Sequence, residues 1–98
     1  MINRNENGEI VSVDKLSEIT AELKKIEKKL SEAMKKKDSL TEEEEKSLAA
    51  DAADMKALFS AVNPDVQKGA SPLELMGYLK QVVRMKELAE KIKDMKND

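Results

Sequence analysis

The apolar positions of residues 16–33 recur with the spacing of a helix that packs against other helices. Steps of three and four residues alternate along this stretch, whose apolar members are Leu16, Ile19, Leu23, Ile26, Leu30 and Ala33. The positions between them are almost all Lys, Glu, Ser or Thr, so the apolar stripe is narrow. A helix with so narrow a stripe cannot bury it alone. The heptad pattern therefore predicts partner helices, from this chain or from another.

The first helix is predicted to span residues 14–36. Asp14 is a suitable N-cap residue, and Ser12, two residues earlier, is the alternative. At the other end, the lysines that follow Met34 are typical of a helix C-terminus, because their positive charge interacts favourably with the negative end of the helix dipole. The best-buried positions of this helix are expected to be Leu23, Ile26 and Leu30.

A second helix is predicted over residues 41–62. Its start carries two overlapping capping-box patterns, formed by Ser39 with Glu42 and by Thr41 with Glu44. Its apolar stripe continues the heptad through Leu48, Ala52, Met55, Phe59 and Val62. Asn63-Pro64 ends the helix because a residue before proline is disfavoured in the helical region. The short connection makes the first and second helices antiparallel neighbours.

A third helix is predicted over residues 72–95, after a connection that Val66 could anchor. Ser71 is its expected cap, Pro72 fits the first helical position, and Glu74 has the spacing that closes a capping box. Gly77 is unfavourable inside a helix, so we expect a close helix crossing at that level.

Residues 1–13 are expected to form a flexible N-terminal arm whose apolar end docks on the helices. A small hairpin is the alternative, because Asn7-Gly8 is a tight-turn signal and residues 10–13 favour extended backbone. An isolated two-stranded hairpin is only marginally stable in water, which favours the arm. The predicted fold is thus all-α: a single helical domain over residues 14–98, with an antiparallel helical hairpin and a third helix in a small, coiled-coil-like three-helix bundle.

The apolar surface of the third helix changes direction partway along its length. At 100° per residue, the apolar residues of the first half, from Leu75 to Val83, lie on one side of the helix. Those of the second half lie roughly 120° away from them. We expect the first half to pack into the bundle and the second half to face another protein or a second copy. The predicted partner-binding residues are Met85, Leu88, Ile92 and Met95. In the alternative, the first two helices wrap around the third and cover this strip as well.

The composition argues against catalysis and against metal or cofactor binding. The chain has no His, Cys or Trp, which removes the commonest general base, the thiol nucleophile and the usual zinc ligands. No pair of titratable residues is predicted in an apolar pocket, so we expect no enzyme, no catalytic residue, no cofactor, no metal site and no small-molecule substrate. No apolar run approaches the roughly 20 residues that span a bilayer, and the first residues contain no apolar signal-peptide core. A cytoplasmic protein, or one exported without a cleaved signal peptide, is expected.

Charge is divided unevenly along the chain, although the net charge is only −2. Residues 15–37 carry four more basic than acidic side chains, and residues 38–65 carry six more acidic than basic ones. The lysine stripe of the first helix is a candidate phosphate-binding surface, formed by Lys24, Lys25, Lys28, Lys29 and Lys35–Lys37. With only two arginines and few aromatic side chains, nucleic-acid binding is the weaker reading. An inhibitor that mimics nucleic acid with its acidic second helix is weaker still.

The function favoured by these observations is a non-enzymatic helical protein–protein interaction module, such as an assembly subunit, an adaptor or a small chaperone. In size, acidity and helical content the chain is similar to small helical-hairpin components and chaperones of bacterial secretion and phage-assembly systems. No sequence motif connects it with them. A nucleic-acid-associated regulator that uses the lysines of the first helix is the alternative. The partner is expected to be a protein, or a second copy that associates through the third helix.

Overall fold

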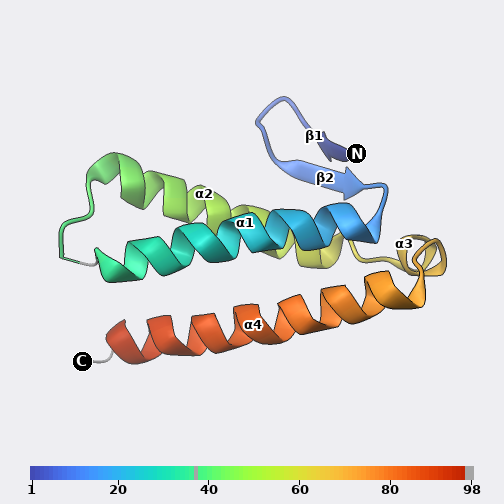
Figure 1. Ribbon diagram of the computed structural model, residues 1–98. Coiled ribbons are helices and arrows are strands. Elements are labelled where there is room, and N and C mark those ends of the chain that lie inside the picture. The colour runs from blue at the N-terminus through green and yellow to red at the C-terminus, as the bar shows by residue number, and fades with distance from the viewer. Residues whose placement is uncertain (37, 97–98) are drawn as a thin grey trace.

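The computed structural model describes residues 1–36 and 38–96, with side chains described up to residue 94 (Figure 1). Within these ranges it contains three long helices, one short helix and a two-stranded antiparallel sheet. The predicted helical class is therefore confirmed. The elements in chain order are β1 (Ile2–Arg4), β2 (Ile10–Val13), α1 (Leu16–Lys35), α2 (Glu42–Ser60), α3 (Pro64–Lys68) and α4 (Pro72–Lys96).

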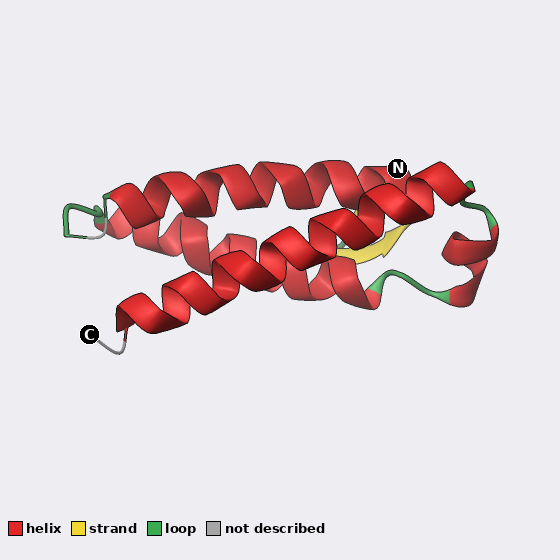
Figure 2. Cartoon of the chain, turned by 60° about the horizontal axis from the view of Figure 1, so that its bottom comes forward, coloured by secondary structure: helices red, strands yellow, loops and turns green. Residues whose placement is uncertain are grey.

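Helix α1 is the central element of the molecule. It runs antiparallel to α2 and parallel to α4, and it contacts both of them (Figure 1). Helices α2 and α4 share few direct contacts within the described part of the chain. Figure 2 shows α4 crossing obliquely on one side of α1 and α2, with the hairpin on the other. The predicted three-helix bundle is therefore met only in part, because its third side is open.

The heptad of α1 supplies most of the core. Leu16, Ile19, Leu23 and Ile26 are buried, and they pack with Leu58 of α2 and with further residues of α4, α3 and the hairpin. The last two heptad positions of α1 are only half-buried. This corrects the expectation for Leu30. The core is therefore concentrated around the first half of α1, and it thins toward the end where α2 begins.

Two of the three predicted helix starts carry the expected caps. Thr41 and Glu44 form a capping box on α2, with 3.1 Å from the Glu44 amide to the Thr41 hydroxyl. The Ser71 hydroxyl accepts a hydrogen bond from the Glu74 amide at 3.2 Å, at the start of α4. The N-cap of α1 is Lys15, without a side-chain hydrogen bond, so neither predicted cap is used. The Asp14 carboxylate instead lies beside the amino group of Met1.

The N-terminal residues form the hairpin that we considered the weaker alternative to a flexible arm. Gly8 has a positive φ of 80°, and the Asn5 side chain accepts hydrogen bonds from two backbone amides of the turn. Tertiary contacts supply the stability that an isolated hairpin lacks, because Ile10 and Val13 are buried against α1 and α2. Arg4 also binds Asp54 of α2 in a bidentate pair, at 3.2 and 3.3 Å.

The connection between α2 and α4 contains the short helix α3. The Asn63 side chain accepts a hydrogen bond from the Val66 amide at 2.9 Å, and Pro64 occupies the first turn. Val66 is buried in the core, so it anchors this connection as predicted. Gly77 of α4 faces open space, and no close helix crossing accounts for it.

Candidate functional site

Two of the predicted partner-facing residues are buried within the chain itself. Met85 is 4% exposed and Leu88 is 8% exposed, because α1 covers this side of α4. The expectation that they face a partner is therefore corrected. Ile92 is half-buried beside a groove that is described below. The side chain of Met95 lies outside the described residues.

A polar residue on the inward face of α4 explains why the apolar pattern was misread. Gln81 is 2% exposed, and its side-chain amide donates a hydrogen bond to Glu27 of α1 at 2.8 Å. The other carboxylate oxygen of Glu27 accepts a hydrogen bond from Arg84 at 3.2 Å. With Gln81 counted as an inward position, one continuous face of α4 packs on α1. A polar contact of this kind favours a single register between the two helices.

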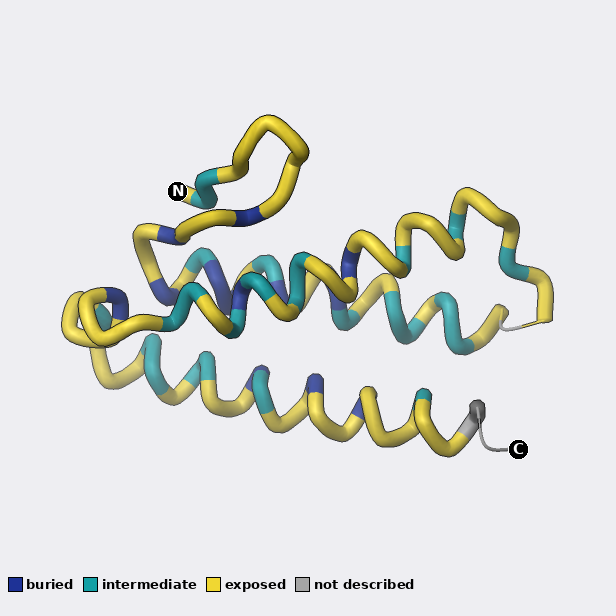
Figure 3. The backbone as a smooth tube through the Cα atoms, turned by 180° about the vertical axis from the view of Figure 1, so that it is seen from behind, coloured by how far each residue is buried: buried dark blue, intermediate teal, exposed yellow. Residues whose placement is uncertain are grey.

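The outward face of α4 carries an exposed apolar strip, which we call the outer strip. Its members have exposed fractions of 53–80% and are Leu73, Met76, Leu79 and Val83. Figure 3 shows this side of α4 as mostly exposed, whereas the side toward α1 is buried or half-buried. Leu79 and Val83 were predicted to pack inside, so this surface was missed from sequence. Single exposed apolar residues are common on protein surfaces, and these four side chains along one side of α4 form only a small patch.

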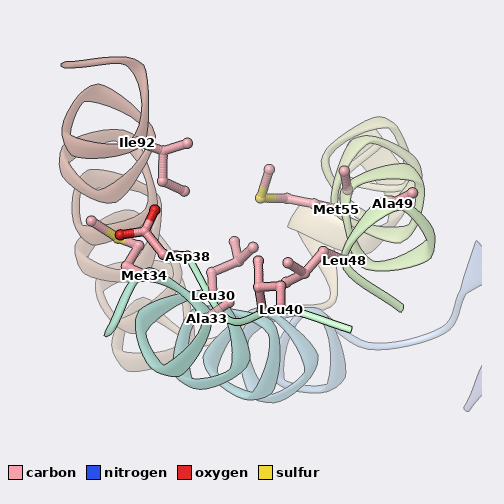
Figure 4. A pocket seen from close by; sticks show the side chains of 10 residues that line it. Leu30, Ala33, Met34, Asp38, Leu40, Leu48, Ala49, Met55 and Ile92 are labelled. Carbon is pink, nitrogen blue, oxygen red and sulfur yellow. The ribbon is translucent and has the colours of Figure 1, made fainter. Parts of the chain in front are cut away.

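An apolar groove is bounded by the second half of α1, the first half of α2 and the end of α4. It encloses about 620 Å³ and is open to solvent. Figure 4 shows Leu30 on its floor, with Met55 and Ile92 pointing into it from opposite walls. Apart from Asp38, every described residue that lines the groove is apolar. The lining consists of Leu30, Ala33, Met34, Asp38, Leu40, Leu48, Ala49, Ala52, Met55 and Ile92.

The groove follows from the arrangement of the helices and from the residues along α2. Helices α2 and α4 both pack on α1 but diverge from one another, so the space between their facing sides is left unfilled. The side chains of Ala49 and Ala52 are too small to reach across it. Ala52 belongs to the predicted apolar stripe of the second helix, but it is exposed on the groove wall. The neighbour of both alanines in this chain is open space.

A second, smaller cavity of about 230 Å³ lies between α1 and α2, and both charged and apolar residues line it. Its most buried member is Asp51, which is 7% exposed. One carboxylate oxygen of Asp51 is 3.6 Å from the Lys29 amino group, and the other has no hydrogen-bond partner among the described residues. No cluster of three or more potential metal-binding side chains occurs in the described ranges. This cavity accordingly offers a single buried carboxylate rather than a set of ligands.

The charged residues that could contact phosphate are partly engaged within the chain. Arg4 and Arg84 each bind a carboxylate of another element, Asp54 and Glu27 respectively. On α1, Lys29 and Lys36 face carboxylates of α2, at 3.6 Å from Asp51 and 3.8 Å from Glu44. Lys24, Lys28 and Lys35 are exposed. Lys37, which we included in the candidate phosphate-binding stripe, lies outside the described residues.

The fold and its groove define a small helical domain with an N-terminal hairpin and an incompletely filled bundle. No protein-family model matches the sequence, and neither the curated proteins nor the solved structures include a significant match. Within the described part of the chain, none of the helices combines the length and the apolar character needed to cross a membrane.

Proposed function

We propose that this protein is a non-enzymatic helical interaction module that binds another protein through the groove between α2 and α4. An assembly subunit, an adaptor and a small chaperone are the roles that fit such a module. The observation that carries the proposal is the lining of the groove, in which the described residues are one carboxylate and nine apolar side chains from three segments of the chain.

The chemistry of the lining supports binding rather than catalysis. A catalytic pocket needs a nucleophile or an acid–base pair beside the reacting atoms, and Asp38 is an exposed carboxylate without such a partner in the lining. Covering the apolar walls would remove them from water, at about 25 cal/mol per Å² of apolar surface. Met34 and Met55 suit a protein partner because their side chains adapt to the shape of the surface they meet.

The proposal is tested by placing a charge in the groove and measuring the capture of partners. Ala52→Glu puts a carboxylate on the groove wall, and Ala53→Glu makes the same change at the next position, which does not line the groove. The tagged proteins are incubated with an extract of the cells that produce the protein, and bound proteins are compared by mass spectrometry. We expect Ala53→Glu to capture the same proteins as the unmodified chain, in similar amounts. Ala52→Glu should capture at least about tenfold less of each of them.

Both alanines are exposed on α2, so both variants are expected to fold. Thermal melting followed by circular dichroism checks this directly. Equal capture by the two variants, with equal melting temperatures, would contradict a binding site in the groove. Retention lost in high salt, together with nucleic acid in the bound fraction, would favour the lysines of α1 instead.

A further inference from the structure

The turn of the N-terminal hairpin contains an Asn-Gly pair. Asn7 and Gly8 are exposed in the loop that joins β1 to β2, and this loop projects from the body of the helices (Figure 1). In such a pair the backbone nitrogen of glycine can attack the side-chain amide of asparagine, because glycine has no Cβ to obstruct the approach. Every other asparagine in the chain has a different neighbour. The residues that follow them are Arg4, Glu6, Pro64 and Asp98.

The reaction replaces the side-chain amide with a carboxylate and consumes water. The Gly8 nitrogen loses its proton and forms a bond to the side-chain carbonyl carbon of Asn7. The bond from that carbon to the amide nitrogen breaks, and ammonia leaves. Water then opens the resulting cyclic imide at either of its carbonyl groups. One opening gives aspartate with the original backbone. The other gives isoaspartate, in which the backbone runs through the side-chain methylene.

The folded turn holds the attacking nitrogen in a hydrogen bond. The Gly8 amide donates to the backbone carbonyl oxygen of Asn5 at 3.0 Å. The side-chain oxygen of Asn5 accepts hydrogen bonds from the amides of Asn7 and Glu9, at 2.9 and 3.0 Å. An amide that is hydrogen-bonded in this way loses its proton only when the local structure opens. Attack on the Asn7 side chain therefore requires the turn to open.

Contacts outside the turn determine how often it opens. Ile10 and Val13 of β2 are buried in the core, and an isolated hairpin without such contacts is marginally stable. Arg4 connects the turn to α2, because its guanidinium donates to the Gly8 carbonyl oxygen at 2.7 Å and to Asp54 at 3.2 Å. The docking of the hairpin on the helices is thus the barrier to the reaction.

The two products differ in whether the turn can form again. Isoaspartate inserts a methylene into the backbone between the amides of Asn7 and Glu9, which both bind the same Asn5 oxygen. The lengthened backbone cannot place both amides at their original positions. Aspartate leaves the backbone unchanged and retains both hydrogen bonds.

We propose that Asn7 is a site of spontaneous deamidation that the docked hairpin protects, and that the isoaspartate product keeps the hairpin from closing again. The modification is an irreversible record of hairpin opening. It removes the cover that Ile10 and Val13 provide to the core around the first half of α1. The inference does not depend on the proposed function of the groove.

The first test compares the folded chain with the same chain unfolded in guanidinium chloride. Both are incubated at mildly alkaline pH, and mass spectrometry after proteolysis detects the conversion of an amide to a carboxylate at position 7. We expect the reaction to be at least about tenfold slower in the folded chain. Equal rates would overturn the protection by the fold. Absence of the reaction in both states would overturn the modification site.

A pair of matched variants on β2 tests the role of docking. Val13→Ala removes methyl groups that are buried, whereas Val11→Ala makes the same change at a side chain that is 61% exposed. When opening and closing are fast relative to the reaction, its rate follows the population of the open hairpin. We expect deamidation to be at least about fivefold faster in Val13→Ala and within about twofold of the unmodified chain in Val11→Ala.

Hydrogen exchange of the Gly8 amide provides an independent measure of opening and should accelerate by the same factor as deamidation. Asp54→Leu is the second variant if Val13→Ala does not fold, because it breaks the ion pair with Arg4 and leaves the core unchanged. It should accelerate deamidation at least about twofold. Equal deamidation rates in Val11→Ala and the variant that weakens docking would overturn the proposal.

The final test compares the two products. The isoaspartate form is separated by ion exchange and compared with Asn7→Asp, which introduces the charge without lengthening the backbone. We expect the methyl resonances of Ile10 and Val13 to move to positions typical of an exposed, unstructured segment in the isoaspartate form only, while circular dichroism shows that the helices remain. Unchanged methyl resonances in the isoaspartate form would show that the hairpin closes again, and would overturn this part of the proposal.

Discussion

The heptad residues of α1 and the buried Gln81 of α4 lie where these two helices meet. The heptad of α1 predicted the buried positions Leu16, Ile19, Leu23 and Ile26, because four apolar residues at alternating spacings of three and four have one plausible inward face. Gln81 had the opposite effect. A polar residue in a buried seam is invisible to a hydrophobic pattern, and only its pairing with Glu27 shows why it is tolerated there.

Asp51 is another buried polar residue that the pattern did not predict, and it lies at an inward position of α2. Its pairing with Lys29 is long, at 3.6 Å, and one of its oxygens lacks a partner among the described residues. Replacing a buried, poorly satisfied carboxylate with an apolar residue is commonly neutral or stabilising. We therefore expect Asp51→Leu to raise the free energy of unfolding by about 1–2 kcal/mol in urea denaturation.

Asp54 provides the control for this prediction, because it lies one turn later in α2 and both of its oxygens are bound by Arg4. Asp54→Leu should lower the free energy of unfolding by about 0.5–1 kcal/mol, since it removes the ion pair that joins the hairpin to α2. If Asp51→Leu destabilised the protein as much as Asp54→Leu, Asp51 would have a stabilising partner in addition to Lys29.

At the scale of elements, the helix starts were predictable where the cap is local and not where it is tertiary. The capping residues of α2 and α4 lie within three residues of the amides they bind, so their spacing is visible in the sequence. The start of α1 is different, because Asp14 is drawn to the amino group of Met1. The hairpin was also underestimated. Its stability depends on burying Ile10 and Val13 against helices that are distant in sequence.

Helix α4 offers the clearest test of which face packs inside. Leu88→Glu would bury a carboxylate beneath α1 and should lower the free energy of unfolding by about 3 kcal/mol or more, which a thermal melt by circular dichroism would detect. Val83→Glu changes an outer-strip residue that is 56% exposed and should have an effect within about 0.5 kcal/mol. The reverse order of stabilities would restore the original assignment of the two faces.

At the scale of the whole molecule, the sequence predicted that the first and second helices are neighbours but did not predict the groove beside them. The basic first helix and the acidic second helix do lie side by side, joined by ion pairs of Lys29 with Asp51 and of Lys36 with Glu44. These pairs are partly exposed and individually weak, so they add to a packing that the core determines. The groove could not be predicted, because the hydrophobic pattern of a helix is the same whether its apolar residues face another helix or an open groove. Of the three predicted partner-binding residues whose side chains are described, Met85, Leu88 and Ile92, only Ile92 lines the groove.

The central claim is that the apolar space between α2 and α4 is open in the isolated protein. The most direct test is the effect of a soluble paramagnetic agent on methyl relaxation, which reports how closely solvent approaches each methyl group. We expect the methyl groups of Met55 and Ile92, which line the groove, to be relaxed much more strongly than those of Leu23 and Ile26, which are buried. If all four were equally protected, α4 would be closed onto α2 in solution, and the protein would have no groove for a partner protein to enter.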